Sequence, residues 1–302
     1  MHIPDGILSN RIWLSLDAVS GATVLYAARR LHIRASARLI PLMGVLSAFV
    51  FAAQLLNFPV LGGTSGHLVG GALLAILLGP LAGFLTMTTV VAAQALFLQD
   101  GGIAALGANI FNIAAIPALS GYGIYQLAGG RSGRDRGVAL AGFLAGWASL
   151  VLSAVFCALQ LALSGVVPLG VGLPAMAGYH AVIGIAEGGL TAGVLAFLAR
   201  TRADLVQGDP DACLRPLDFL VVVPLVALPC AVLLLAGTSN LPDPLQTLLA
   251  STTAHPEQAP DSEQLLSPAR YRDYLWVLAS AFAVVPIAYA LARASQRWKR
   301  NA

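Results

Sequence analysis

The chain has 302 residues, of which 58% are hydrophobic and only 10% are charged, and its formal net charge at pH 7 is +3. Soluble domains carry charge on about a quarter of their residues, so this composition excludes a soluble enzyme and predicts an all-α polytopic membrane protein. The only lysine is Lys299. The phosphate-binding loop G-x-x-x-x-G-K-[ST] needs a lysine, and Lys299 does not stand in such a motif. The chain is therefore not itself a P-loop ATPase.

The first six residues are Met-His-Ile-Pro-Asp-Gly. No basic residue precedes the first apolar stretch, so we expect no cleavable secretory signal and a free amine on Met1. That amine, the backbone nitrogen of His2 and His2 Nδ1 can close two fused chelate rings around one metal ion. An amide nitrogen ligand favours square-planar geometry, which suits Ni²⁺ or Cu²⁺, allows Co²⁺ and disfavours tetrahedral Zn²⁺. A fourth donor is then required.

Apolar segments of about 20 residues, the length of a membrane-spanning helix, recur along the chain. We expect single spans near residues 11–29, 38–57, 105–128, 137–164, 175–199, 216–237 and 273–294. The stretch 67–99 is too long for one span. Its Leu-Gly-Pro sequence at 78–80 predicts a short helix followed by a full one, because proline starts a helix better than it continues one. The prediction is about nine transmembrane helices.

The cationic residues predict the orientation of these helices. With the N-terminus outside and the C-terminus in the cytoplasm, the cytoplasmic segments hold all of the Lys and Arg residues except Arg11, Arg270 and Arg272. This distribution follows the positive-inside rule. The N-terminal residues would then face the external supply of ions.

The predicted spans divide the chain into a membrane core over 1–200, a cytoplasmic linker over 201–215 and a two-helix segment over 216–302. Between the last two helices, residues 238–272 are rich in Pro, Ser, Thr, Asp and Glu, which predicts a solvated and mobile external loop. Its acids, Asp243 among them, could concentrate cations. An ordinary polar loop is the simpler interpretation.

The predicted third span opens with the glycine-rich sequence Leu-Gly-Gly-Thr-Ser-Gly-His-Leu-Val-Gly-Gly at 61–71. Glycine lets the backbone turn tightly and approach other groups closely. We expect His67 in the first turn of a helix at the external mouth, where its imidazole would supply the missing fourth nitrogen. A histidine at a helix start is more often a capping residue, so this assignment depends on the N-terminal chelate.

Four motifs together resemble the NikM/CbiM family, the substrate-capture subunits of nickel and cobalt energy-coupling-factor (ECF) transporters. They are the N-terminal hexapeptide, Gly-Gly-Thr-Ser-Gly-His-Leu-Val-Gly-Gly at 62–71, Gly-Ala-Asn-Ile-Phe-Asn at 107–112 and Ala-Glu-Gly-Gly-Leu-Thr at 186–191. The resemblance covers residues 1 to about 200. It implies a square-planar site of four nitrogens, three from Met1 and His2 and one from His67, with supporting or loop-ordering roles for Thr64, Ser65, Asn109 and Asn112.

The same resemblance implies the partners and the location. ATP would be hydrolysed by a separate pair of cytoplasmic ATPases, which act through a membrane coupling subunit. The chain would be a multi-pass protein of a bacterial plasma (inner) membrane, without a permanent cofactor, since Ni²⁺ or Co²⁺ is its cargo. No nucleic-acid partner is expected.

Residues 216–302 resemble the two-span companion subunit NikN, which is fused behind the core in some nickel systems. The companion's Pro-Asp-Gly-Leu-Glu signature appears here as Pro-Asp-Pro-Leu-Gln at 242–246. The fusion favours nickel over cobalt, and the Irving–Williams order adds a modest preference for Ni²⁺. A cobalt-specific protein that supplies cobalamin synthesis is the alternative.

Two other classes of protein remain open. Gly-Thr-Ser-Gly at 63–66 fits the G-x-S-G signature of rhomboid intramembrane proteases, with Ser65 as nucleophile and His180 as general base. That short motif explains neither the N-terminus nor the tail. A stand-alone metal permease would line its path with carboxylates, and only Asp17 and Glu187 qualify. We expect Glu187 to tie helices together, and Asp17 to face a crevice or to hold the N-terminal segment.

Overall fold

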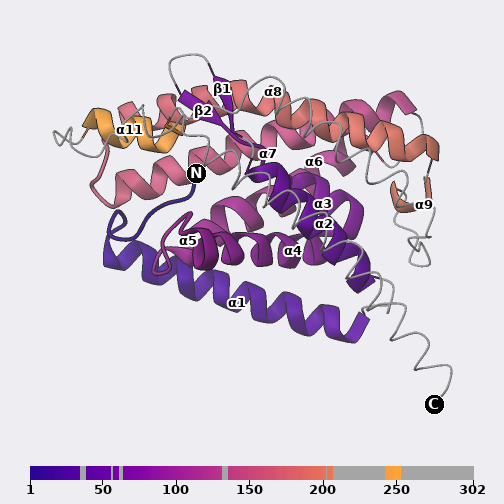
Figure 1. Cartoon of the computed structure of the whole chain (residues 1–302), viewed down its shortest axis with the longest axis horizontal. Helices are drawn as coiled ribbons and strands as arrows, with labels where there is room; N and C mark the ends of the chain where they lie inside the picture. Colours follow the sequence, from indigo (N-terminus) through magenta and orange to yellow (C-terminus); the bar gives the residue numbers. More distant parts are fainter. Residues whose placement is uncertain are drawn as a thin grey trace, which may run out of the picture.

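The computed structural model describes residues 1–34, 39–55, 57–60, 64–130, 135–201, 203–206 and 242–252. These residues are mostly helical, with one short hairpin (Figure 1). The long helices are α1 (Asn10–Arg34), α2 (Leu39–Gln54), α4 (Pro80–Ala93), α6 (Ile116–Leu127), α7 (Asp135–Leu163) and α8 (Leu169–Thr201). The short ones are α3 (Gly71–Leu78), α5 (Leu106–Asn109), α9 (Ala203–Val206), α11 (Pro244–Thr252) and two π-helical turns, η1 (Gln94–Leu98) and η2 (Ile110–Ala115).

Helices α7 and α8 lie along one side of the molecule and α1 lies along the other, with α3, α4 and α6 between them (Figure 1). Glycines permit the close approach of α7 and α8. A Cβ atom on Gly188 would lie 2.7 Å from the Phe143 carbonyl oxygen, and one on Gly146 would lie 2.9 Å from Thr191 Oγ1. Small residues at helix contacts are characteristic of packing in membranes.

The predicted break in the stretch 67–99 is confirmed. Gly79 has φ of +84°, a conformation that favours glycine, and Pro80 begins α4. Together, α4 and η1 form an apolar helix from Pro80 to Leu98 that is long enough to cross a membrane. The segment predicted at 105–128 is also helical, although it runs through α5, η2 and α6 rather than one regular helix.

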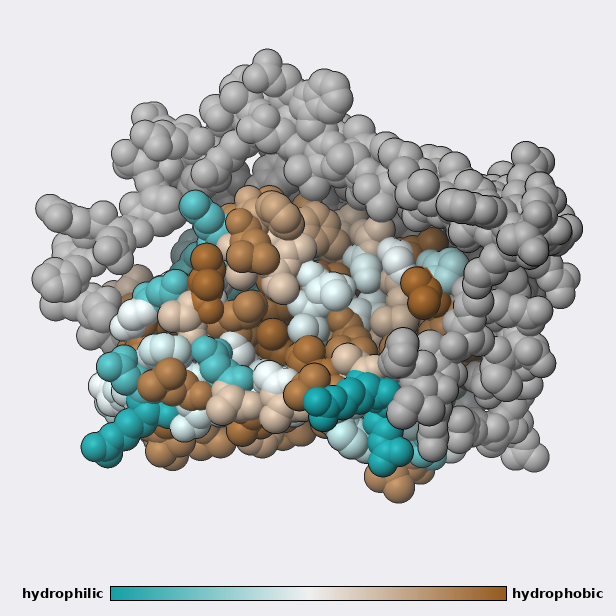
Figure 2. Space-filling view, turned by 90° about the horizontal axis from the view of Figure 1, so that it is seen from below, coloured by the Kyte–Doolittle hydropathy of each residue, from teal (hydrophilic) through white to brown (hydrophobic). Residues whose placement is uncertain are grey.

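Three helical stretches of the described residues are long and apolar enough to span a membrane, namely Pro80–Leu98, Gly137–Leu163 and Leu169–Arg200. Large apolar side chains such as Leu14, Leu25 and Leu140 are exposed on the helices. On the face in Figure 2, hydrophobic residues are widely spread and most hydrophilic ones gather toward the two ends. The predicted spans 216–237 and 273–294 lie outside the described residues, so the count of nine and the orientation stay predictions.

One prediction about the His67 region is wrong. His67 does not lie in the first turn of a helix, because α3 begins at Gly71. Residues 64–66 form strand β2, which pairs antiparallel with β1 (Phe58–Val60), and residues 67–70 have no regular structure. Gly70, with φ of +78°, turns the chain from this extended segment into α3.

The prediction of a solvated loop over 238–272 is also wrong for its described part. Residues 244–252 form α11, and its Leu245 and Leu248 are buried in the hydrophobic core. Asp243 begins this helix with a reciprocal cap, in which its Oδ1 accepts from Gln246 N and its own N donates to Gln246 Oε1. Apolar residues three and four positions apart, at 245, 248 and 249, form a helical pattern that the polar composition of the loop concealed.

Candidate metal centre

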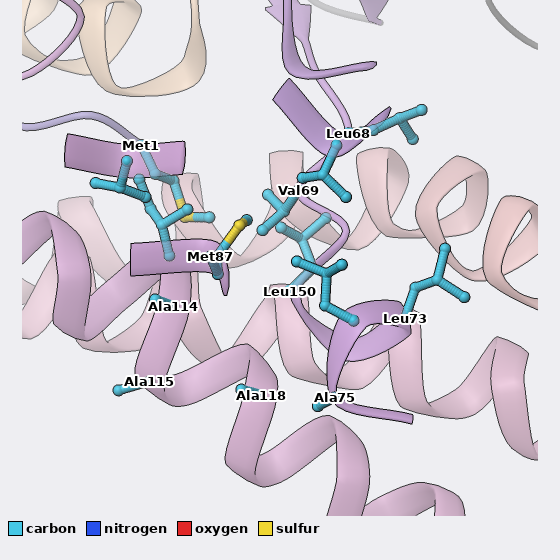
Figure 3. Close-up of a cluster of buried hydrophobic side chains, with 14 of the residues drawn as sticks. Met1, Leu68, Val69, Leu73, Ala75, Met87, Ala114, Ala115, Ala118 and Leu150 are labelled. Carbon is cyan, nitrogen blue, oxygen red and sulfur yellow. The ribbon is translucent and has the colours of Figure 1, made fainter. Parts of the chain in front are cut away.

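The N-terminal residues are buried in the protein rather than extended into solvent. Relative exposure is 2% for Met1, 7% for His2 and 0% for Ile3. The Met1 side chain belongs to a hydrophobic cluster that includes Met87 and Ala114 (Figure 3). Full burial of such a side chain contributes about 1.5–3 kcal/mol to stability. This packing holds the N-terminus in a fixed position.

Hydrogen bonds fix the backbone just after the proposed chelate. Asn109 Oδ1 accepts from Ile3 N at 2.7 Å, and Asn109 Nδ2 donates to the Ile3 carbonyl at 3.0 Å. The same carbonyl accepts from Gly102 N at 2.9 Å. Because Asn109 lies at the end of α5, this helix sets the position of the terminal dipeptide.

The loop between η1 and α5 holds the N-terminal segment from another direction. Both carboxylate oxygens of Asp5 accept backbone hydrogen bonds at 3.0 Å, from Ile103 and Ala105. Gly101 has φ of +92°, and a Cβ there would lie 2.7 Å from Asn109 Nδ2 and 3.4 Å from His2 Cβ. The loop therefore needs glycine to wrap this closely around His2.

The structure brings His2 and His67 together. Their ring centroids are 5.5 Å apart, and the ring planes are inclined by 46°. His67 Nδ1 lies 3.0 Å from the Leu68 carbonyl oxygen, so Nδ1 is the protonated nitrogen and Nε2 keeps its lone pair. Burial, with the charge of the Met1 amine and the neighbouring His2, lowers the pKa of His67 to about 4. At neutral pH the His67 imidazole is uncharged and can act as a ligand.

Neighbouring elements hold the segment that carries His67. Glu187, on α8, accepts backbone hydrogen bonds from Val69 at 2.8 Å and from Gly70 at 2.7 Å. Gln54, near the end of α2, donates to the Val69 carbonyl at 2.6 Å. Glu187 thus joins α8 to the start of α3, as expected of a residue that ties helices together.

Both ring nitrogens of His2 are buried. Nε2 makes no hydrogen bond, whereas Nδ1 lies 2.7 Å from Asp100 Oδ2. Buried polar atoms without partners are rare because they cost free energy. Nδ1 is also the atom that the fused-ring chelate requires.

Two carboxylates flank the proposed ligands, and sequence reasoning gave neither a place in the site. Asp100 faces His2, and Asp243 Oδ2 lies 3.2 Å from the Met1 amine. Burial alone would raise the pKa of each acid, but the contact of Asp100 with His2 and the charge of the Met1 amine beside Asp243 lower both below their usual range. Burial likewise opposes protonation of the Met1 amine, and the Asp243 carboxylate reverses this, so the amine pKa is raised above 8.0.

The other residues singled out from the sequence have different contacts. Asn112 exchanges two hydrogen bonds of 2.8 Å with Gln160. Asp17 accepts from Gly107 N at 2.6 Å, which holds α5 and, through it, the N-terminal segment. Ser65 N donates to the Pro242 carbonyl at 2.9 Å, while Thr64 pairs with Val60 in the hairpin. His180 Nδ1 lies 2.7 Å from the Met176 carbonyl oxygen of its own helix.

Within the part of the chain that the structure describes, no three His, Cys, Asp or Glu residues form a metal-binding cluster. The proposed site differs from such a cluster because two of its four donors are the terminal amine and a backbone nitrogen. Its donors are nitrogen only, a set that suits Ni²⁺, Cu²⁺ or Co²⁺. Residue type alone therefore does not reveal it.

Comparison with known proteins gives consistent matches. The family CbiM, described as "Cobalt uptake substrate-specific transmembrane region", matches residues 2–205. A relative from Haloquadratum walsbyi is 45% identical over 212 residues, which cover 68% of this chain and 93% of the relative. The "Fused nickel transport protein NikMN" of Rhodobacter capsulatus is 34% identical, over 68% of this chain and 64% of that protein. A crystal structure of a truncated transition metal transporter matches with a TM-score of 0.61 and 33% identity, over 67% of this chain and 99% of the other.

Proposed function

This chain belongs to the CbiM family of nickel and cobalt transport membrane proteins, and from that premise we propose that it is the substrate-binding subunit of an ATP-driven ECF transporter. It captures Ni²⁺ or Co²⁺ outside a bacterial plasma membrane. The ion is held in a square-planar site by the Met1 amine, the His2 amide nitrogen, His2 Nδ1 and His67.

The observation that supports this proposal most is the burial of the terminal dipeptide beside a neutral histidine. Met1 and His2 are almost fully buried, and the His2 ring lies 5.5 Å from the His67 ring, centroid to centroid. A terminal segment fixed in this way needs little further ordering when it binds an ion, which favours affinity. Asn109 contributes to this ordering, and Thr64 and Ser65 order the hairpin that leads to His67.

Metal capture exchanges protons for the ion. The Met1 amine must lose its proton, and the His2 amide must lose its hydrogen to become a ligand. The neutral His67 imidazole loses nothing. A divalent ion with one deprotonated amide keeps a net charge of +1, close to that of the protonated amine it replaces. The charge of the buried site therefore changes little on loading.

The work of transport comes from other subunits in this proposal. Without a phosphate-binding loop, the chain depends on a cytoplasmic ATPase pair and a membrane coupling subunit. Nickel is the preferred cargo, because the chain resembles fused nickel proteins such as that of Rhodobacter capsulatus. Cobalt remains the alternative, since an all-nitrogen site suits both ions.

Uptake of radioactive nickel tests this function. Cells that express the chain together with its ATPase and coupling subunits should accumulate at least about tenfold more nickel than cells that express the chain alone. A His67→Ala variant, expressed with all partners, should reduce uptake to the level of the chain alone. Equal uptake with and without the partners would contradict the ATP-driven proposal and would favour a stand-alone permease.

A further inference from the structure

Asp243 links the end of the chain to its beginning. It lies 242 positions after Met1, and its Oδ2 accepts from the Met1 amine at 3.2 Å. Its other oxygen, Oδ1, accepts from Gln246 N at 2.7 Å and caps α11. One carboxylate therefore joins α11 to an atom that the proposed function makes a metal ligand.

The segment that carries Asp243 is attached to the site at further points. The Pro242 carbonyl accepts from Ser65 N, two residues before His67. Leu245 and Leu248 are 1% and 4% exposed, and α11 packs against α8 and β2. These contacts hold the Asp243 carboxylate at the amine, independently of the ion pair itself.

A charge balance gives the carboxylate a role in the loaded state as well. In the metal-free protein, the Asp243 carboxylate forms an ion pair with the Met1 amine at 3.2 Å. After capture, the ion and the deprotonated His2 amide together carry +1 at the same place. Leaving such a charge unpaired in a buried site is strongly unfavourable.

We propose that Asp243 is the counter-ion of the metal site, so that residues 242–252 complete the site that the N-terminal core begins. This inference rests on the proposed metal-binding function. The carboxylate is a positioning residue: it orients the amine before capture and balances the remaining charge afterwards. It is not required as a ligand.

Asp243 is better placed than Asp100 for this role. The Asp243 side chain is 21% exposed, whereas that of Asp100 is 49% exposed. Water screens the charge of an exposed group more effectively. Asp243 also contacts the Met1 amine, at the start of the chain, while Asp100 contacts the imidazole of His2.

Two substitutions at position 243 separate the charge from the helix cap. Asparagine caps helices as well as aspartate does but carries no charge, and glutamate carries the charge but is not a preferred cap. The experiment measures the Ni²⁺ affinity of the purified full-length chain at about pH 8.5, near the ordinary pKa of an α-amine. We expect Asp243→Asn to weaken binding by about tenfold to a hundredfold, and Asp243→Glu to recover most of that loss.

A matched variant, Gln246→Ala, weakens the same cap while it leaves the carboxylate at the amine. It should bind Ni²⁺ within about threefold of the unmodified chain. The proposal is overturned if Asp243→Asn binds as tightly as Asp243→Glu or more tightly, or if Gln246→Ala loses as much affinity as Asp243→Asn.

A chain extended by one residue before Met1 separates the counter-ion proposal from the proposed metal site. If the extended chain still binds Ni²⁺ tightly, the metal site itself is wrong. If it does not bind while Asp243→Asn binds normally, only the counter-ion is wrong.

Discussion

At the scale of single residues, the proposed site depends on backbone atoms that side chains hold in place. Asn109 shows this most clearly, because its amide forms two hydrogen bonds with Ile3 and none with the three proposed ligand residues. Its effect on the metal would come through the position of the backbone. A substitution of Asn109 can therefore test whether metal binding requires the terminal dipeptide to be ordered in advance.

We predict that Asn109→Ala weakens Ni²⁺ binding by about tenfold or more, because loss of the amide leaves the buried Ile3 N–H without its partner and the Ile3 carbonyl with Gly102 N alone. Isothermal titration of the purified protein measures this change. Gln160→Ala is the matched control, since it breaks a buried amide pair with Asn112. Both variants should lose about 1–3 kcal/mol of stability. An equal loss of affinity in the two would instead show a general effect of destabilisation.

The pH dependence of capture also belongs to the residue scale. The pKa of the Met1 amine is raised above 8.0, so the proton is present at neutral pH and competes with the metal. Affinity should therefore fall as pH falls, by about tenfold for each proton released per pH unit, and both the amine and the amide release one. His67 adds nothing until the pH approaches its pKa of about 4.

Titrations with Ni²⁺ between about pH 8 and pH 6 measure this dependence, with free metal corrected for buffer binding. A His67→Ala variant should show weaker binding with the same slope, since His67 stays neutral in this range. Affinity that is independent of pH would contradict a site that contains the amine and a deprotonated amide.

At the scale of elements, the contact between α8 and the segment that carries His67 sets the position of that proposed ligand. The Glu187 carboxylate accepts from two consecutive backbone N–H groups at the start of α3. The two groups belong to Gly70, the N-cap of α3, and to Val69 just before it, where the positive end of the helix dipole favours a carboxylate. Through them, α8 sets the position of the segment that carries His67.

We predict that Glu187→Gln weakens Ni²⁺ binding and lowers the melting temperature, because an amide offers only one accepting oxygen where two N–H groups donate. The loss of a charge-assisted bond in a buried position should cost about 1–3 kcal/mol. Gly189→Ala is a control on the same helix, since a Cβ there meets no atom within 4 Å. It should leave both affinity and melting temperature unchanged. Normal affinity in Glu187→Gln would refute the role of α8 in holding His67.

Some elements could be predicted from the sequence because their signals are local. The break before α4 depends on two adjacent residues, Gly79 and Pro80, and it was predicted correctly. The start of α3 was not, because it is set by Glu187, more than a hundred positions later. Composition likewise favoured a loop at 244–252, where burial of Leu245 and Leu248 stabilises a helix instead.

At the scale of the whole molecule, residues distant in the sequence assemble the candidate site. The N-terminus, the hairpin, the loop after η1 and α11 all contribute groups within hydrogen-bonding distance or ring contact of one another. The sequence could indicate Met1, His2 and His67 by their chemistry. It could not indicate Asp100 or Asp243, because an acid in a polar loop looks the same whether or not it reaches the terminal dipeptide.

The central claim is that the terminal amine is a metal ligand, and the most direct test moves that amine. A full-length chain with one alanine before Met1, placed behind a protease site that regenerates Met1, provides the extended and native forms of one molecule. Isothermal titration with Ni²⁺ should show an affinity at least about a hundredfold lower for the extended form, and cleavage should restore it. Equal, high affinity before and after cleavage would contradict the account.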